Sequence, residues 1–543
     1  MKKYLKSKSL VPATIGLIVF IGLVIRLYRI SDNQFLFYDE GMYLGYNRAF
    51  LNLVANNPAH SLSEFGVILS LMFKTALTTA KALWFFILNL RVFIFGSEAW
   101  YFARWVSAAS GLGTVILLFF WSRRFLKSTP IAVLSALILL ILPSHVFYSR
   151  LGMQEALSTL LFLSAICLYM SSERIRWTFF LSAFLLACVY LTNYRMIIAP
   201  IFIAFIECFY AFLGKESGRG KVSLEKIISK IKWQKIALYA AVFYGIVLLV
   251  GSLYGGVNLH VTLAWMFHQA QDAGGKFNPV NFLSYPYYVF VLEGVFFACF
   301  FWGNVYFFKY KEYAKLLPFG IVVLQMGIFS FAAEKGARYV CVVLPFMAAA
   351  AAVVVDDAWR RFPKLHNLIL GFGILALGGM VYLSGMTALA RTDYEEAVHF
   401  ITDHDPQASI VSTQPLVEGL FMSDEKKIVA CPNDLYSLMA LYKHGARYLI
   451  LDPQSYISWD LDGRRFSPPL VDFLELTLKN VQPLQTFPHL NKFLLNRFVL
   501  DHNEQILDST HFLSVAQEEG YGKIRIYDLN TVFSTLQQLM QKV

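Results

Sequence analysis

The chain contains little charge for its length. Only 15% of its 543 residues are Asp, Glu, Lys or Arg, whereas 57% are hydrophobic. A soluble globular protein of this length needs more charged surface, so the composition excludes that class. We therefore expect a protein that crosses a membrane many times.

The sequence also lacks the signatures of several other protein classes. The six cysteines have neither a metal-type spacing nor an obvious pairing, which argues against a zinc site and a disulfide framework. No glycine-rich phosphate fingerprint and no internal repeat is visible. The net charge of +11 is basic, but the lysines and arginines cluster in short loops between apolar runs. Membrane topology explains that clustering better than nucleic acid does, so we expect no nucleic-acid partner.

Apolar runs of spanning length dominate residues 1–388, which we interpret as one transmembrane domain of α-helices. The criterion of about 20 apolar residues predicts roughly eleven transmembrane helices, and up to about 13 if the loop 31–100 hides another pair. The first run is followed by no small-residue cleavage site, so we expect it to remain as a helix. The runs lie near residues 11–30, 101–121, 131–148, 155–171, 177–193, 195–213, 236–254, 287–308, 315–332, 338–355 and 366–386.

Lys and Arg in the loops predict the orientation. With the N-terminus in the cytoplasm, every cytoplasmic loop is basic, as in "WSRRFLKS" and "DDAWRRFPKLH". The opposite loops, and everything after about Gly385, are then extracytoplasmic, in a cell inner or plasma membrane. The first outer loop, 31–100, is apolar but interrupted by Lys74, Lys81 and Arg91, which favours helices lying in the membrane interface.

From residue 389 to 543 the chain becomes mixed and polar. Short β-rich runs, "ASIVST", "KIVAC", "ARYLILD" and "KIRIYDL", alternate with helix-like stretches such as "DYEEAVHFITDH" and "DLYSLMALYKHG". This alternation predicts a small α/β layer with parallel strands. We expect a soluble extracytoplasmic domain with an accessory or acceptor-handling role.

Charged residues gather at the predicted outer ends of the helices, although they are far apart in the sequence. A passive membrane protein rarely places so many ionisable groups at one depth. They are Asp39 and Glu40 after the first span, Lys81 in the long loop, Arg150 and Glu155 around the fourth span, Arg195 at the sixth, and Arg338 with Tyr339 at the tenth.

Four segments carry a resemblance to a known family over about the first 390 residues. They are "RLYRISDNQFLFYDEGMYLGYNRAF", "KALWFFILNLRVFIFGSEAWYFARWVSA", "PSHVFYSRLGMQEALSTLLFLSAICLYM" and "EKGARYVCVVLPFMAAAAA". In this order they resemble GT-C glycosyltransferases, in particular the protein O-mannosyltransferase and aminoarabinose transferase group. Three positions depart from the pattern: Ala82 follows Lys81 where a proline is usual, Glu155 replaces an aspartate, and Arg195 stands where lysine is frequent.

The resemblance implies transfer of a sugar from a polyprenyl-phosphate donor to an acceptor on a protein, a glycolipid or a cell-wall polymer, with inversion. An acceptor hydroxyl needs a base, for which we choose Asp39. Departing lipid phosphate gains negative charge, which fixed cations stabilise. Arg338 and Lys81 are the first candidates, with Arg195 and Arg150 behind them and Tyr339 beside Arg338.

Glu155 could orient Asp39, bind a sugar hydroxyl, or hold a metal with Glu40. No cofactor is required, because cationic side chains can neutralise the leaving group, but a divalent cation stays an open alternative.

Structural interpretations compete with these roles. The Asp39-Glu40 pair could begin a solvated helix, Arg150 could pair with Glu155, and Arg26 and Arg29 could extend to the outer headgroups. His260, His268 and Asp272 could be a metal or acceptor surface, although solvated loop residues are the better interpretation. A transporter or flippase is the main functional alternative, and a receptor or assembly factor is a third. Transporters tend to have internal repeats and central charges, neither of which is visible here.

Overall fold

The computed structural model divides the chain into two compact units. One unit, called here the helical unit, contains Met1–Tyr28, Phe50–Ala333 and Ala337–Ala388, and the other, the α/β unit, contains Arg29–Ala49, Glu334–Gly336 and Leu389–Val543. The stretch that carries Glu40 therefore belongs to the same unit as the C-terminal residues. The structure describes residues 10–31, 81–95, 101–213, 228–254, 282–310, 313–331, 336–389, 392–422, 424–452, 469–478, 480–488 and 523–541, with scattered positions between 40 and 70.

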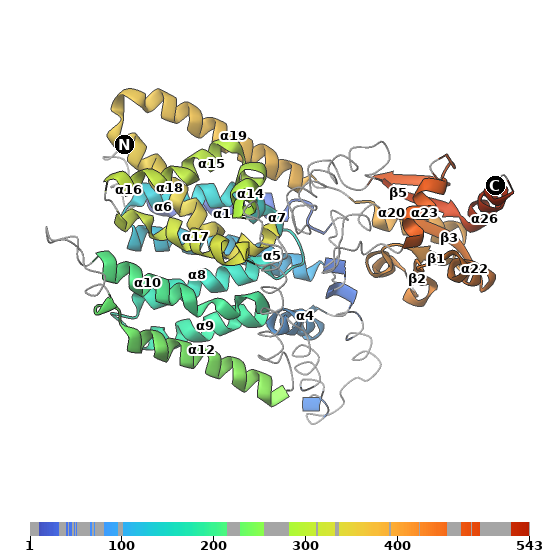
Figure 1. The fold of residues 1–543 in the computed structure, drawn as a ribbon, viewed down its shortest axis with the longest axis horizontal. Helices are drawn as coiled ribbons and strands as arrows, with labels where there is room; N and C mark the ends of the chain where they lie inside the picture. The colour runs from blue at the N-terminus through green and yellow to red at the C-terminus, as the bar shows by residue number, and fades with distance from the viewer. Residues whose placement is uncertain are drawn as a thin grey trace. The chain divides into compact units, whose positions relative to one another are not determined.

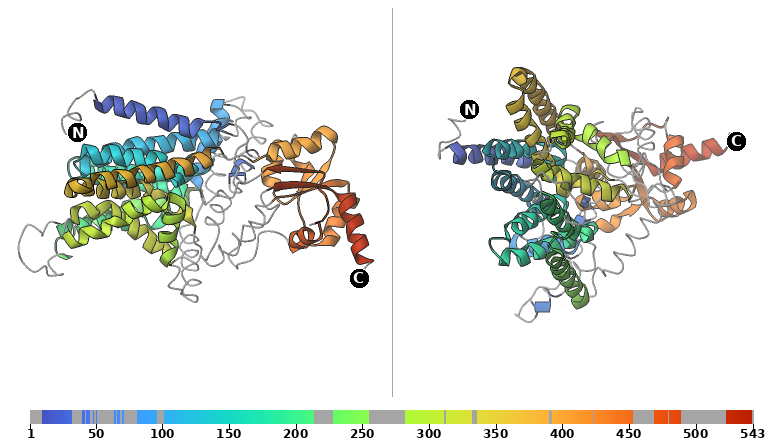
Figure 2. Two further views of the ribbon diagram at one scale, coloured as in Figure 1. Left: turned by 90° about the horizontal axis from the view of Figure 1, so that it is seen from above. Right: turned by 60° about the vertical axis from the view of Figure 1, so that its left-hand side comes forward.

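The helical unit is a bundle of long helices that run side by side (Figure 1, Figure 2). Within it α8 packs against both α5 and α9, and α18 packs against α6, α15 and α17. The helices are α1 (Leu10–Leu27), α4 (Ala82–Phe95), α5 (Phe102–Phe125), α6 (Thr129–Ile141), α7 (Pro143–Tyr148), α8 (Glu155–Ser171), α9 (Trp177–Thr192), α10 (Pro200–Leu213), α12 (Trp233–Tyr254), α14 (Ser284–Glu293), α15 (Val295–Trp302), α16 (Tyr306–Tyr310), α17 (Leu317–Ser330), α18 (Leu344–Arg361) and α19 (His366–Ala388), with short 3-10 turns η2 (Tyr194–Ile198), η4 (Gly303–Val305), η5 (Tyr313–Leu316), η6 (Ala337–Val343) and η7 (Pro363–Leu365).

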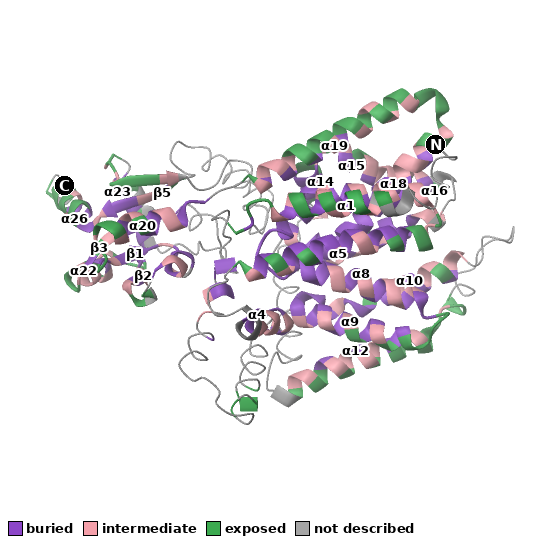
Figure 3. Cartoon of the chain, turned by 180° about the vertical axis from the view of Figure 1, so that it is seen from behind, coloured by how far each residue is buried: buried purple, intermediate pink, exposed green. Residues whose placement is uncertain are grey.

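Small residues allow the centre of this bundle to pack closely. The run Ala348–Ala352 of α18 is fully buried, and such small side chains let helix backbones approach one another. By contrast, α12 and α19 are apolar yet largely exposed, and only 17% of the most apolar stretch of each is buried. Figure 3 shows this contrast between the buried α8 and the exposed outer side of α19. Exposed apolar helices of this kind require lipid around them, so the chain is a membrane protein.

Helix length agrees with the membrane interpretation. Among the described residues five helices are long and apolar enough to cross a membrane, and seven shorter apolar helices accompany them. The predicted span 287–308 is not one α-helix, because it breaks at Gly294 and passes through a 3-10 turn at Gly303–Val305. Gly294 has φ 91°, which a glycine adopts without the strain that a Cβ would cause. The predicted total of about eleven spans stays a prediction.

The α/β unit is built on one five-stranded sheet in the order β2-β1-β3-β5-β4. The four β-rich runs form β1 (Ser409–Ser412), β2 (Ile428–Ala430), β3 (Ala446–Leu451) and β5 (Lys523–Asp528). The predicted parallel strands are found in part of the sheet: β1 is parallel to β2 and β3, but β5 is antiparallel to β3 and to β4 (Gln485–Pro488). Helices α20 (Tyr394–His404), α21 (Pro415–Glu418), α22 (Leu435–Lys443), α23 (Pro469–Leu478) and α26 (Leu529–Met540) and the turns η8 (Gly419–Phe421) and η9 (Glu425–Lys427) complete the described part.

Two carboxyl groups are buried beyond the ends of the parallel strands. Glu418 on α21 and Asp452 after β3 are both fully buried. Desolvation raises the pKa of Glu418 well above its usual range; the Ser412 hydroxyl opposes this shift, and the nearby Asp452 adds to it. Glu418 therefore prefers its neutral form in the folded unit.

Candidate functional site

Three predicted site residues come together at one end of the helical unit, called here the η6 end. The start of α8, which carries Glu155, packs against η6, which carries Arg338 and Tyr339. Two hydrogen bonds join the elements. The Thr159 hydroxyl of α8 is shared between the Glu155 carbonyl, at 2.8 Å, and the Cys341 carbonyl of η6, at 3.2 Å, and the Gln325 Nε2 of α17 donates to the Tyr339 carbonyl over 2.7 Å.

Arg195 joins this group through its aromatic neighbours. Its guanidinium carbon lies 4.4 Å from the centre of the Tyr339 ring and 5.0 Å from the centre of the Tyr194 ring. Arg195 is only 9% exposed, so little water screens its charge. A guanidinium that stacks on rings keeps its charge and holds its in-plane donors in a fixed direction. The structure thus brings two predicted phosphate-binding residues, Arg195 and Tyr339, into direct contact, although 144 residues separate them.

Glu155 occupies the first turn of α8 and is 2% exposed. Its Oε1 accepts a hydrogen bond from the Nε2 of Gln154 over 3.0 Å. The unpaired backbone N–H groups at a helix N-terminus stabilise a carboxylate there. The Glu155 carboxyl group therefore lies at the η6 end, where its predicted roles require it.

Arg150 binds backbone carbonyls. Its Nη1 donates to the carbonyls of Ile25 and Arg26 over 2.8 and 3.1 Å, and its Nη2 donates to those of Tyr28 and Ala388 over 2.8 and 3.4 Å. These carbonyls end α1 and α19, where helices leave acceptors without intrahelical partners. The described contacts of Arg150 are thus those of a residue that ties two helix ends together.

The prediction that Arg26 extends to the headgroups is wrong. Arg26 is 1% exposed, and its Nη2 lies 2.8 Å from the Nδ1 of His145. Its Nη1 also donates to the Leu140 carbonyl over 3.3 Å. Its side chain turns inward because these acceptors, on α7 and the end of α6, lie inside the bundle.

Burial varies among Arg338 and the other predicted residues. Arg338 is half-buried within η6, and Lys81 is half-buried directly before α4, whose Trp84 and Leu88 are buried. Glu40 is fully buried in the α/β unit. Asp39 lies outside the described residues, as do His260, His268 and Asp272.

The segment that contains Glu40 is tightly fitted to the α/β unit. A Cβ added at Gly41 would lie 2.5 Å from the Cγ2 of Val417, so only glycine fits there without movement. Arg48 donates to the carbonyls of Gly419 and Met422 over 2.8 and 3.0 Å. These bonds join residues about 370 positions apart in the sequence, so no local pattern predicts them.

A metal site has no support in the described part of the chain, which contains no group of three or more His, Cys, Asp or Glu that could hold an ion. All six cysteines are free. Metal independence itself stays a prediction.

Sequence reasoning missed polar residues inside the bundle. Arg104, His145, Glu207 and Glu293 are all nearly inaccessible to solvent. A single ionisable residue inside an apolar run was the available signal, since such residues in membrane segments are costly and seldom incidental. Glu293 in "YVFVLEGVFF" is the clearest case.

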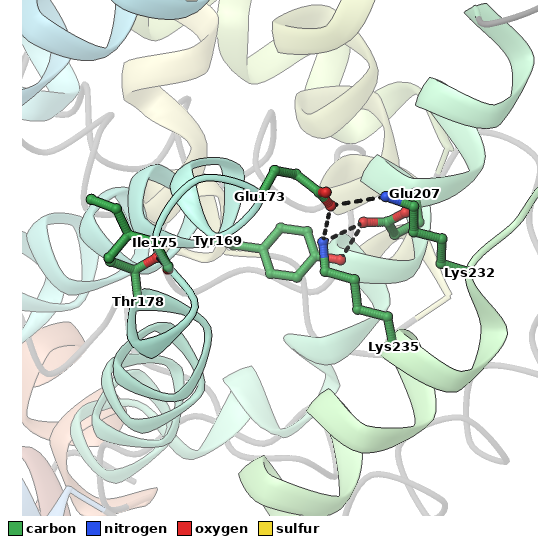
Figure 4. A network of polar contacts seen from close by, with 7 residues as sticks. All are labelled: Tyr169, Glu173, Ile175, Thr178, Glu207, Lys232 and Lys235. Carbon is green, nitrogen blue, oxygen red and sulfur yellow. Dashed lines mark hydrogen bonds and ion pairs between the residues drawn. The ribbon is translucent and has the colours of Figure 1, made fainter.

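The opposite end of α8 carries a second polar network (Figure 4). The Nζ of Lys235 lies 2.8 Å from Glu173 and 3.0 Å from Glu207, and Lys232 lies 2.9 Å from Glu173. The Tyr169 hydroxyl donates to Glu207 over 2.5 Å. Hydrogen bonds from Lys235 and then Lys232 lower the pKa of Glu173 to about 2. The network joins α8, α10 and α12 at this end.

The fold and its polar ends define a helical membrane protein, and its fold is that of the GT-C glycosyltransferases. The apo oligosaccharyltransferase of Archaeoglobus fulgidus matches with a TM-score of 0.52 at 12% identity, covering 83% of this chain and 70% of that one. ArnT from Cupriavidus metallidurans matches in the apo state with a TM-score of 0.51 at 13% identity, covering 82% of this chain and 94% of that one. The ArnT structure bound to undecaprenyl phosphate matches with the same TM-score and identity, covering 83% and 96%.

At these identities the similarity establishes the fold alone, and at that level it confirms the expected resemblance. Neither the family models nor the curated proteins give a significant match to the sequence.

Proposed function

We propose that the chain is a membrane glycosyltransferase that moves a sugar from a polyprenyl-phosphate donor to an acceptor hydroxyl or amine, with inversion. The observation that carries the proposal is the contact of Arg195 with Tyr339, next to Arg338 and the start of α8. The ArnT structure bound to undecaprenyl phosphate, which has the same fold, supports a lipid phosphate as the ligand. The basic loops support an extracytoplasmic site and a cytoplasmic N-terminus.

The proposed step forms one bond and breaks one bond. The acceptor oxygen or nitrogen attacks the anomeric carbon, and its proton passes to the Asp39 carboxylate. The bond from that carbon to the phosphate oxygen breaks, and the polyprenyl phosphate leaves with the electron pair. Arg338 and Arg195 meet the growing negative charge, with Lys81 as a further cation, and this stabilises the transition state more than the ground state.

Glu155 has a different place in the proposal. Its position in the first turn of α8, at the η6 end, supports a role in orienting the base or in binding a sugar hydroxyl. Arg150 supports the site through the ends of α1 and α19, since both of its terminal nitrogens already bind carbonyls there. We therefore assign the phosphate first to Arg338 and Arg195.

A turnover assay tests the proposal. Full-length protein in lipid nanodiscs is mixed with undecaprenyl-phosphate sugars labelled in the sugar, both hexoses and pentoses, and with cell-envelope fractions as acceptors. We expect acceptor-dependent release of undecaprenyl phosphate and its loss in Asp39→Asn with donor binding retained. A transporter would bind the donor and release no lipid phosphate with any acceptor, and full activity of Asp39→Asn would remove Asp39 as the base.

A further inference from the structure

The short helix α7 lies inside the bundle, where polar side chains of neighbouring helices bind it. All six of its residues are buried, and it contacts α5, α6, α8, α14 and α19. It follows Leu142, whose extended backbone separates it from α6. The chain then passes through residues 149–154 to Glu155. Whatever fixes α7 therefore also fixes the segment that enters the η6 end.

Glu293 holds the first turn of α7 from one side. It is the last residue of α14, directly before the break at Gly294, and it is 3% exposed. Its Oε2 accepts the backbone N–H of Ser144 over 3.2 Å, and its Oε1 accepts the Ser144 hydroxyl. A buried carboxylate is costly unless donors compensate it, and α7 supplies two.

Arg26 holds the same turn through the next residue. Its Nη2 lies 2.8 Å from the Nδ1 of His145, and because a guanidinium can only donate, Nδ1 must accept. The imidazole is then neutral, with its proton on Nε2. Adjacent residues of α7 are thus bound to a carboxylate of α14 and to a guanidinium of α1.

Further bonds fix the chain on both sides of α7. The Ser384 hydroxyl of α19 donates to the Ile141 carbonyl over 2.8 Å, directly before α7. Directly after it, Arg150 binds the ends of α1 and α19, and the Ser107 hydroxyl of α5 donates to the Met153 carbonyl over 2.9 Å. Residues 141–153 are thus bound to α1, α5, α14 and α19, and they lead directly into Glu155.

We propose that Glu293 is a positioning residue: by holding α7 opposite Arg26, it sets where the start of α8 presents Glu155 to the η6 end. The bonds are observed, and the catalytic consequence rests on the proposed function. A catalytic group displaced by about 1 Å can lower a rate by about a hundredfold, so bonds that act by holding α7 in place affect turnover.

The test compares two variants with a matched control. Glu293→Gln keeps the shape but weakens the acceptor, and Ser144→Ala removes the hydroxyl donor. Ser135→Ala is the control, because Ser135 is equally buried on the neighbouring α6 but its hydroxyl bonds only within its own helix, to Ile131. All are full-length proteins in lipid nanodiscs.

Hydrogen exchange of the peptide covering residues 149–159 is the first measurement. We expect exchange at least about tenfold faster in Glu293→Gln and Ser144→Ala, with α9 and α12 unchanged and Ser135→Ala like the wild type. Unchanged exchange in both variants, or an equal rise throughout the bundle, would overturn the proposal.

The second measurement separates position from binding. In the turnover assay kcat should fall at least about tenfold in Glu293→Gln, while the Kd for undecaprenyl phosphate changes less than about threefold. An unchanged kcat with faster local exchange would refute the catalytic consequence. A wild type that neither binds the lipid nor turns over would refute the proposed function instead, and the exchange result would still decide whether Glu293 and Ser144 hold α7.

Discussion

Gly111 of α5 lies against Ser149, the residue directly after α7. Gly111→Ala is the sharpest test of that packing. An added Cβ would lie 2.1 Å from the Oγ and 2.6 Å from the Cβ of Ser149, and 3.1 Å from the Nε of Arg26. The first two contacts are impossible without movement. Ser149 cannot move easily, because its hydroxyl also bonds the His145 carbonyl over 2.5 Å.

Gly113, two residues along the same helix, supplies the matched control. A Cβ there would meet only Leu160, at 3.4 and 3.5 Å, which is ordinary contact. Alanine in place of a helical glycine gains about 0.5–1 kcal/mol, so Gly113→Ala should be neutral or stabilising. Overpacking costs about 1–3 kcal/mol, so Gly111→Ala should be less stable than Gly113→Ala by about that amount.

Denaturant unfolding of both variants in mixed micelles, followed by tryptophan fluorescence, measures this difference in the free energy of unfolding. Equal stability of the two variants would refute the placement of Ser149 against Gly111, and with it the close approach of α5 to the end of α7.

Three further predictions concern buried and exposed carboxylates. Burial raises the pKa of Glu418, so stability falls as pH rises above the ordinary value of 4.5. Glu418→Gln should therefore stabilise the α/β unit by about 1–3 kcal/mol at pH 8 and hardly at pH 5. Hydrogen exchange of β1 and β3 measures this, and no difference between the two pH values would contradict it. The pH dependence of stability from Glu173 has the opposite sign. Its stabilisation is present above pH 4.5 and is lost as pH falls toward 2. Since the side chain is mostly exposed, Glu173→Gln should cost only about 0–1 kcal/mol in thermal unfolding, less at high salt. Glu207→Gln should cost more, about 1–3 kcal/mol, because Glu207 is buried and accepts from Tyr169 and Lys235; an equal cost would contradict the difference in burial.

Local patterns predicted four of the five strands of the described sheet and two of its helices. The β-rich runs that form β1, β2, β3 and β5 alternate with helix-like stretches, two of which form α20 and α22. Strand β4 was missed because "QTFP" has no run of β-branched or apolar residues and ends in proline, which lowers a strand prediction. The antiparallel direction of β5 depends on pairing with β3, which is distant in the sequence and leaves no local signal.

Topology predicted which site residues share an end of the bundle, but not how they meet. Positive-inside counting placed Glu155, Arg195 and Arg338 at one depth, and the structure gathers the elements that carry them. The stacking of Arg195 on Tyr339 depends on side-chain directions that hydropathy does not encode. The inward turn of Arg26 was missed for the same reason, since its acceptor on His145 is more than a hundred residues away.

Binding of undecaprenyl phosphate to the full-length protein in nanodiscs tests the central claim most directly. Arg124 provides the control, because its guanidinium also lies over an aromatic ring, 5.5 Å from the centre of Phe125, at the far end of α5. Loss of charge-assisted bonds to a phosphate costs about 1.5–3 kcal/mol, so Arg195→Ala and Arg338→Ala should each weaken binding about tenfold to a hundredfold. Arg124→Ala should bind like the wild type. Equal affinity in all four proteins would contradict a lipid phosphate site at the η6 end.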